Sequence, residues 1–513
     1  MNVLLINPEF PASFWSMRET NRMLGFKTLM PPLGLLTVAA LLPQEWELRL
    51  VDLNVRALCD GDWAWADVVM ITAMLAQRDG MLALVREAKR RGKTVVAGGP
   101  YPTSVPDEVL EVGCDFLIKG EAEGLMPQLL AALGKRRYRG VFEYAEKPSL
   151  TQSPVPRFDL LELDAYAMLS IQTSRGCPFE CEFCDVISLY GRAPRYKQPQ
   201  QVLAELESIF RLGWRREIFI ADDNFIGNKT QARALLKELI PWSQQHSEPF
   251  GYTTQASINL GHELELIDLM TAANFGFVFV GVESPDVAVL AQTHKRQNLI
   301  QPLVDLLRNI NCNGLTVLGS FIIGFDHEAS GADERIQALV ETANVPLVML
   351  NLLRAPPNTA LWGRLQREGR LRDRDGDEMS DTRMNFAPDR PEAEILSEYA
   401  TAWESLCDPR QFYERARRCV LAMRPTRRAL GTDGTSASKS RVRRKQELAM
   451  LLRLLWRAQR RLPGFWRLVL DVYRRNPSRL TRFFILCGYG ENLFPLSKQL
   501  SQQARAQLTG KNP

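Results

Sequence analysis

Three cysteines separated by three and then two residues are the most chemically specific feature of this 513-residue sequence. Cys177, Cys181 and Cys184 share the spacing C-x3-C-x2-C within residues 174–184. Three thiolates on one short loop can hold three irons of a cubane cluster and leave the fourth iron without a protein ligand. Catalytic metal sites keep an open position of this kind for a small molecule.

A zinc site is the main alternative for these cysteines, and it would need a fourth Cys or His ligand. No histidine occurs before His246, so that ligand would have to come from a distant part of the chain. A chance cluster of free thiols is a second alternative. The other six cysteines are scattered singly, which in a reducing cytosol is typical of small buried apolar residues.

The residues around the cysteines alternate between short apolar runs and amphipathic stretches. Strands are predicted at 170–174, 217–221, 251–255, 276–281, 317–323 and 346–352, with helices between them. Six β–α units predict an α/β fold with a partial (β/α)6 barrel at residues 169–390, whose site lies at the carboxyl ends of the strands. The cysteine loop follows the first strand, so this barrel must position its chemistry.

The cysteine spacing, with an aromatic residue directly before the last cysteine, resembles the radical S-adenosylmethionine (SAM) superfamily. The resemblance implies that Cys177, Cys181 and Cys184 bind a [4Fe-4S] cluster whose open iron chelates the methionine end of SAM. It also implies that Phe183 lies against the adenine of SAM. Asp222 and Asp223 would contact SAM at the position where the superfamily commonly has Gly-Gly-Glu. Further SAM contacts are implied at the ends of later strands, from Gln255, Glu283 and Ser284. Singly, these strand-end groups could be caps or solvated acids.

Residues 1–140 predict a second sheet. Apolar strands at 3–6, 47–52, 67–72, 94–97 and 116–118 alternate with amphipathic helices, which indicates a flavodoxin-like (Rossmann-type) doubly wound parallel sheet. Such a sheet binds its ligand beyond the carboxyl ends of the strands, where the strand order reverses. A sheet of this type ahead of a radical SAM barrel resembles the cobalamin (B12)-binding class.

Five residues at strand ends carry the resemblance to cobalamin-binding proteins: Thr72, Met74, Gly98, Gly99 and Glu121. Thr72 and Met74 correspond to a position beside the nucleotide tail of cobalamin. Gly98 and Gly99 correspond to a place where the absence of side chains lets that tail approach the backbone. Glu121 belongs to a segment that resembles the Gly-Glu-x-Glu turn. The alternative for the glycines is a tight turn. Residues 1–140 contain no histidine. The resemblance therefore implies base-off cobalamin with no His ligand, which favours methyl transfer.

Further motifs at 30–34, 98–104, 222–228 and 321–326 narrow the resemblance to a subgroup that includes the hopanoid C-2 methyltransferase and bacteriochlorophyll side-chain methyltransferases. It implies a radical SAM C-methyltransferase, in which one SAM supplies the methyl group carried by cobalamin and a second is cleaved to a radical that activates an unactivated substrate carbon. A hopanoid is the expected substrate. A tetrapyrrole (chlorin) methyltransferase or cyclase is the alternative, and a cobalamin carrier or sensor without radical chemistry is the alternative of another class.

Charge is distributed unevenly along the chain. Residues 411–513 hold 23 Lys and Arg against 5 Asp and Glu, a balance of +18, whereas the rest of the chain carries −13. The basic helical region at 391–513 is therefore expected to contact anionic phospholipid head groups. The aromatic residues expected at that interface are Trp456, Phe465, Trp466, Phe483 and Phe484. A solvated basic face is one alternative. An RNA-binding tail is another, but tRNA methylthiotransferases carry extra N-terminal cluster cysteines, so no nucleic acid is expected.

The remaining segments complete the predicted organisation. Residues 141–168 contain Pro148, Pro154 and Pro156 and are predicted to be a linker. No apolar run approaches the ~20 residues needed to span a bilayer, and the N-terminus lacks the features of a secretory signal. The chain is expected to be cytoplasmic, with peripheral contact at the inner face of the membrane. Its expected partners are a lipid-like small molecule and an electron donor such as flavodoxin or ferredoxin.

Overall fold

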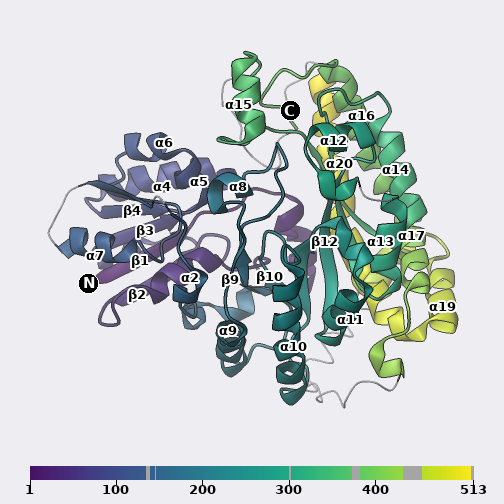
Figure 1. The fold of residues 1–513 in the computed structure, drawn as a ribbon, viewed down its shortest axis with the longest axis horizontal. Helices are drawn as coiled ribbons and strands as arrows, with labels where there is room; N and C mark the ends of the chain where they lie inside the picture. The colour runs from purple at the N-terminus through teal and green to yellow at the C-terminus, as the bar shows by residue number, and fades with distance from the viewer. Residues whose placement is uncertain (135–138, 145, 300–301, 373–381, 431–452, 510–513) are drawn as a thin grey trace.

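The computed structural model describes residues 1–134, 139–144, 146–299, 302–372, 382–430 and 453–509, and it contains two parallel sheets that lie side by side (Figure 1). The N-terminal sheet has six strands in the order β2-β1-β3-β4-β5-β6. These strands are β1 (Asn2–Asn7), β2 (Glu47–Asp52), β3 (Val68–Thr72), β4 (Thr94–Gly98), β5 (Phe116–Lys119) and β6 (Gly140–Glu143). The strand order reverses between β1 and β3, which is the flavodoxin-like pattern.

Alternate residues of β1 point into two separate cores, one on each face of this sheet. Leu4 and Ile6 enter one core, Val3 and Leu5 enter the other, and all four are fully buried. Helices α3 (Asp60–Trp65) and α4 (Arg78–Arg90) pack into the first core, and α2 (Leu33–Ala40) and α7 (Met126–Gly134) into the second. Burial on both faces explains why the strands are continuous apolar runs, and it confirms the doubly wound prediction.

The sixth strand of this sheet was not predicted. It pairs in parallel with β5 at the edge of the sheet, so the domain boundary predicted at residue 140 falls inside β6. Only Phe142 is buried in this strand, and its neighbour Val141 is half-exposed. An edge strand with one buried side chain lacks the apolar run by which the other strands were recognised.

The second sheet is an open, partial barrel, as predicted. Its parallel strands follow the order β7-β10-β11-β12-β13-β14, and its edge strands β7 and β14 do not pair with each other. The strands are β7 (Leu169–Ile171), β10 (Ile218–Ile220), β11 (Tyr252–Ala256), β12 (Phe275–Glu283), β13 (Thr316–Ile323) and β14 (Leu347–Leu352). The connecting helices include α9 (Pro199–Arg211), α10 (Lys229–Gln245), α11 (Leu264–Ala272), α13 (Leu303–Cys312) and α14 (Ala332–Ala343).

One face of the barrel sheet keeps partly exposed side chains. In β12, Val280 is fully buried on one face, whereas Phe279 on the other face is only partly buried. Trp15, from the short helix η1 (Phe14–Ser16), lies against Phe219 and Phe279, with ring centroids 6.3 and 5.3 Å apart. The N-terminal segment therefore covers part of the inner face of the barrel.

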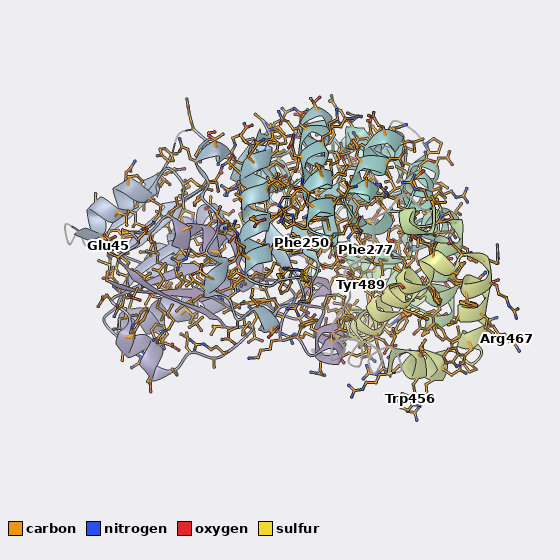
Figure 2. The ribbon with its side chains drawn as sticks, turned by 90° about the horizontal axis from the view of Figure 1, so that it is seen from below. Glu45, Phe250, Phe277, Trp456, Arg467 and Tyr489 are labelled. Carbon is orange, nitrogen blue, oxygen red and sulfur yellow. The ribbon has the colours of Figure 1, made fainter. Side chains whose placement is uncertain are left out.

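The C-terminal region is helical, as predicted. It contains α16 (Glu392–Leu406), α17 (Pro409–Ala422), α19 (Phe465–Arg475) and α20 (Leu480–Leu508). Helix α20 packs against α16, α17 and α1 (Arg18–Leu24). Its Tyr489 ring lies 5.6 Å from that of Phe277 in β12, and Figure 2 shows the two residues close together near the middle of the view. This long helix therefore joins the C-terminal region to the barrel.

Two of the aromatic residues predicted at a membrane surface are core residues instead. Phe465 and Phe483 are fully buried and stack with ring centroids 5.9 Å apart. Phe484 is partly buried against the same core, whereas Trp456 and Trp466 are exposed. Residues 431–452, which supply part of the basic charge, lie outside the described residues. Among the helices that the structure describes, none is long and apolar enough to cross a bilayer.

Candidate functional site

The cysteine loop begins just beyond β7, at the carboxyl edge of the barrel. The strand pair β8 (Ser174–Arg175) and β9 (Arg195–Tyr196) closes the base of the loop in antiparallel register. Gly176 has φ +97°, and a Cβ there would lie 2.9 Å from the carbonyl oxygen of Gly191. The Cys177 N–H donates to that same oxygen at 3.3 Å. A glycine is therefore required immediately before the first cysteine.

The three thiols are largely buried, with the ammonium group of Lys295 and the carboxyl groups of Asp185 and Asp223 nearby. Cys181 is buried, and Cys177 and Cys184 are partly buried. Burial raises the pKa of the Cys177 and Cys184 thiols, and the positive charge of Lys295 acts in the opposite direction on both. The amide of Gln297 also donates to Cys181 Sγ at 3.6 Å. A cation and a donor aimed at sulfur favour the thiolate form that a metal ligand must have.

The donor set fits a cubane cluster. In the part of the chain that the structure describes, no three His, Cys, Asp or Glu side chains gather closely enough to hold a single metal ion. A cubane distributes its protein ligands over different iron corners, so one thiolate for each of three irons is sufficient. Cys177, Cys181 and Cys184 are the residues that would hold the cluster, and the bound cluster supplies the electron that cleaves SAM.

Asp222 anchors the turn before the cysteine loop. It follows β10, is buried, and accepts four hydrogen bonds from the backbone and hydroxyl groups of Thr173 and Ser174, at 2.5–3.0 Å. Four donors match the four lone-pair directions of a carboxylate. The structure therefore gives Asp222 a positioning role, and the prediction that it contacts SAM gains no support from this geometry.

Asp223, the next residue, faces the cysteine loop. Its Oδ2 accepts the N–H of Gly176 at 2.7 Å, which places the carboxyl group directly before Cys177. Burial raises the pKa of Asp223 to about 7, although the Gly176 hydrogen bond acts against this shift. Of the two predicted acids, Asp223 is the one placed beside the predicted cluster ligands.

Glu283 ends β12 in a constrained conformation beside a buried lysine. Its φ is +65°, and the register between β12 and β13 shifts between Gly281 and Glu283. Lys295 Nζ lies 2.7 Å from Glu283 Oε1, with both side chains about nine-tenths buried. The same ammonium lies 5.8 Å from the ring centroid of Phe183. Lys295 thus connects two predicted SAM contacts to the cysteine loop.

The other two predicted SAM contacts lie at neighbouring strand ends. Ser284 Oγ accepts the N–H of Asp286 at 3.1 Å, so this side chain stabilises the turn that follows β12. Gln255 in β11 is partly exposed and is in parallel register with Phe279. It therefore shares the inner face of the barrel with Phe279. Whether either residue contacts SAM stays a prediction.

Sequence reasoning missed Lys295 and Arg175. Lys295 lies in the segment between α12 (Val287–Gln292) and α13, with no motif around it, and only its burial reveals its role. Arg175 is part of the cysteine segment, but its partners are Glu121 and Glu123 of the N-terminal domain. Contacts between residues so far apart in the sequence leave no local pattern.

The two predicted cobalamin glycines differ in what surrounds them. Gly99 has φ +102°, and a Cβ there would lie 2.5 Å from Thr72 Oγ1. A Cβ at Gly98 would meet Ile118 at an ordinary 3.5 Å. The fold itself therefore requires Gly99, in line with the tight-turn alternative, whereas the fold leaves room for a Cβ at Gly98. Met74, beyond β3, is 50% exposed.

An open hollow of about 200 Å³ lies where the order of the N-terminal strands reverses. It is lined by residues that follow β1 and β3, including Phe10, Arg18, Leu75, Gln77 and Arg78. Ligands of doubly wound sheets bind at this place. The carboxyl edge of the N-terminal sheet thus offers a ligand site, although the Glu121 side chain is committed to Arg175 and Arg195. That Glu121 contacts cobalamin stays a prediction.

Family models match three consecutive parts of the chain. A B12 binding domain matches residues 23–130, the radical SAM superfamily matches residues 171–339, and a domain of unknown function matches residues 359–506. In the structure, these parts contain most of the N-terminal sheet, most of the barrel, and the C-terminal helices.

Several known proteins are similar over most of the chain. An uncharacterised methyltransferase of Synechocystis is 44% identical over 99% of this chain and 94% of that protein. The hopanoid C-2 methylase of Rhodopseudomonas palustris is 37% identical over 72% of this chain and 71% of that protein. The bacteriochlorophyllide d C-12(1)-methyltransferase of Chlorobaculum tepidum is 24% identical over 74% of this chain and 83% of that protein. The solved structure of the cobalamin-dependent SAM radical enzyme OxsB, with aqua-cobalamin and SAM bound, has a TM-score of 0.62, covers 99% of this chain and 81% of its own, and is 16% identical.

The chain therefore belongs to the cobalamin-dependent radical SAM methyltransferases. Its cofactors are a [4Fe-4S] cluster, SAM and cobalamin, and it is an enzyme. The interpretation as a carrier or sensor without radical chemistry is set aside, because family members of this similarity over both domains are methyltransferases.

Proposed function

We propose that this enzyme transfers a methyl group to an unactivated carbon of a hydrophobic substrate, and specifically to C-2 of a hopanoid. The observation that carries this proposal is the 37% identity to a hopanoid C-2 methylase over 72% of the chain. This is higher than the 24% identity to the bacteriochlorophyllide methyltransferase over a similar share.

The inner face of the barrel suits an apolar substrate. Phe219 and Phe279 project from β10 and β12 toward Trp15, and together they form an aromatic surface within the barrel. Gln255 adds an amide on the same face, in register with Phe279. Apolar walls with few polar groups are typical of sites that bind and orient hydrophobic ligands.

The residues of this chain have to bind and orient the substrate and the cofactors, and they have to exclude water from the site. The bound cofactors supply the radical and the methyl group, so no side chain is needed as a general acid or base at a C–H or alkene carbon. Trp15 covers the inner face, and Asp222 fixes the turn before the cysteine loop. Positioning is the main contribution that a protein makes to such a reaction.

The cofactor arrangement is also part of the proposal. Residues 1–140 contain no histidine, so we propose that cobalamin binds base-off, without a His ligand from this domain. We propose flavodoxin or ferredoxin as the electron donor. Peripheral contact between the basic C-terminal region and the inner face of the cytoplasmic membrane would bring the enzyme to a membrane-dissolved substrate. We propose no nucleic-acid partner.

Lipid analysis of a deletion strain tests the substrate. Loss of C-2-methylated hopanoids, with restoration by the intact gene and not by a gene that encodes Cys177→Ala, is the expected result. Unchanged methylated hopanoids together with loss of a methylated tetrapyrrole would overturn the hopanoid proposal in favour of a tetrapyrrole methyltransferase or cyclase. That second candidate is supported by the bacteriochlorophyllide methyltransferase among the relatives.

A further inference from the structure

Four buried charged residues join the N-terminal domain to the base of the cysteine loop. Glu121 and Glu123 lie in the turn after β5, at the carboxyl edge of the N-terminal sheet. Arg175 lies in β8, two residues before Cys177, and Arg195 lies in the partner strand β9. The exposed fractions of the four side chains are 2%, 3%, 11% and 17%.

The contacts within this group are short and mostly paired. Arg175 donates to Glu121 at 2.6 Å and lies 2.7 Å from Glu123. Arg195 uses both terminal nitrogens on Glu121, at 2.6 and 3.0 Å. Two guanidinium groups face two carboxylates, so the group is neutral as a whole. Bidentate arginine–carboxylate pairs fix direction as well as distance.

The linker and the barrel hold the same group from other directions. Arg195 also donates to the carbonyl of Pro148 at 2.6 Å, and Ser153 donates to Glu123 at 3.2 Å. Arg175 Nε donates to Gln172 at 2.7 Å. The N-terminal domain, the linker and the first barrel turn therefore meet at one buried network.

We propose that Glu121, Glu123, Arg175 and Arg195 act as a clamp that fixes the cysteine loop relative to the N-terminal domain, and so sets the separation between the cluster and cobalamin. The carboxyl edges of the two sheets carry the two cofactor sites, and the clamp is a direct polar connection between them. A misplacement of about 1 Å can cost on the order of 100-fold in rate when reacting groups must be aligned. These four are positioning residues: the geometry shows them contacting one another, the linker and the barrel turn.

The clamp assigns the Gly-Glu-x-Glu turn a role within the protein. The carboxylates of Glu121 and Glu123 are occupied by arginine, so in this proposal they hold the base of the cysteine loop and do not bind a ligand. The proposal depends on the two cofactor sites and is independent of the substrate. It can therefore be tested without knowing what the enzyme methylates.

The test compares Glu121→Gln with the unmodified protein in two measurements that need no substrate. In the cofactor-free protein, the rate of Cys177 alkylation by a maleimide reports the order of the loop. In protein loaded with cobalamin and the reduced cluster, electron paramagnetic resonance reports the magnetic coupling between cob(II)alamin and the cluster, and hence their separation. Arg157→Met is the matched control, because it breaks an exposed arginine–aspartate pair of the linker, Arg157–Asp159.

The expected result is alkylation about tenfold faster in Glu121→Gln, as for a loop whose closed state loses about 1.4 kcal/mol, together with weakened or broadened coupling. Arg157→Met should match the unmodified protein in both. Unchanged alkylation and unchanged coupling in Glu121→Gln would overturn the proposal. If this variant fails to fold, the double variant Glu121→Gln with Arg195→Gln is used instead, because it leaves Glu123 and Arg175 as a pair balanced in charge. The same two measurements on the double variant then test the proposal.

Discussion

Lys295 Nζ lies 2.7 Å from Glu283 Oε1 at the carboxyl edge of the barrel, and both side chains are almost completely removed from solvent. Burial opposes a charge on Lys295, but Glu283 and the thiols of Cys181 and Cys184 raise the pKa of this lysine above its usual range. The pair therefore places one positive charge between a predicted SAM contact and the cluster ligands.

Replacing Lys295 should destabilise the protein. Lys295→Met leaves the Glu283 carboxylate buried without its partner, which costs about 3–5 kcal/mol when a buried pair is broken. Lys295→Met combined with Glu283→Gln removes both charges and should recover part of the loss. Urea unfolding of the cofactor-free proteins measures these differences. A double variant that loses as much stability as the two single variants added together would argue against a direct interaction.

Gly99 and Gly98 should respond differently to alanine. Gly99→Ala combines a positive φ with a Cβ placed 2.5 Å from Thr72 Oγ1, so a loss of about 1–3 kcal/mol in unfolding free energy is expected. Gly98→Ala adds a Cβ at an ordinary contact distance and should leave stability nearly unchanged.

The same pair tests the predicted cobalamin contact, through titration of cobalamin absorbance. If the nucleotide tail passes over Gly98, the stable Gly98→Ala protein should bind cobalamin more weakly. Equal cobalamin affinity in Gly98→Ala and the unmodified protein would remove Gly98 from the predicted site.

Glu328 should make stability depend on pH. It is buried after β13, and burial raises its pKa to about 7, although hydrogen bonding to Gly324 and the charge of Arg390 act against the shift. Because the folded pKa is above the unfolded one, the folded state binds more protons between about pH 4.5 and pH 7. The contribution of Glu328 to stability is therefore lost as the pH rises through this range.

The loss should be at most about 3 kcal/mol. Glu328→Gln should remove this pH dependence. The stability of the variant relative to the unmodified protein should therefore increase from pH 4.5 to pH 7. Urea midpoints at several pH values measure this. A difference that stays constant with pH would show that Glu328 is ionised throughout.

An exposed stripe on α19 should contribute to membrane contact. Trp466, Leu470 and Tyr473 are spaced as one helical face and are 48%, 49% and 60% exposed. Arg467, beside this stripe, projects outward at the edge of the molecule, as does Trp456 (Figure 2). Apolar side chains flanked by arginine are typical of helices that lie in a bilayer interface.

Changing all three stripe residues to alanine should weaken binding to phosphatidylserine-containing vesicles several-fold in a flotation assay. Val287→Ala, which truncates a side chain that is 68% exposed in α12, is the control. Binding that is unaffected by the triple change, or binding to RNA that depends on the stripe, would exclude this role.

Local patterns predicted the parts of this protein that depend on neighbouring residues. The cysteine spacing predicted the superfamily and its [4Fe-4S] cofactor, and the apolar runs predicted both sheets. Patterns could not distinguish Phe465 from Trp466, because α19 carries large apolar residues on both its buried and its exposed faces. They also missed the contacts of Arg175 with Glu121, since these arise only when two domains meet.

The most direct test of the account is reductive cleavage of SAM by anaerobically reconstituted protein. With Cys177, Cys181 and Cys184 intact, the protein should bind about four irons per chain, show the absorbance of a [4Fe-4S] cluster and form 5'-deoxyadenosine under a strong reductant. Replacing the three cysteines with alanine should abolish all three results, whereas Cys114→Ala, at a buried cysteine of the N-terminal domain, should keep them. Reconstituted protein that shows no cubane spectrum, or that leaves SAM intact, would contradict the account.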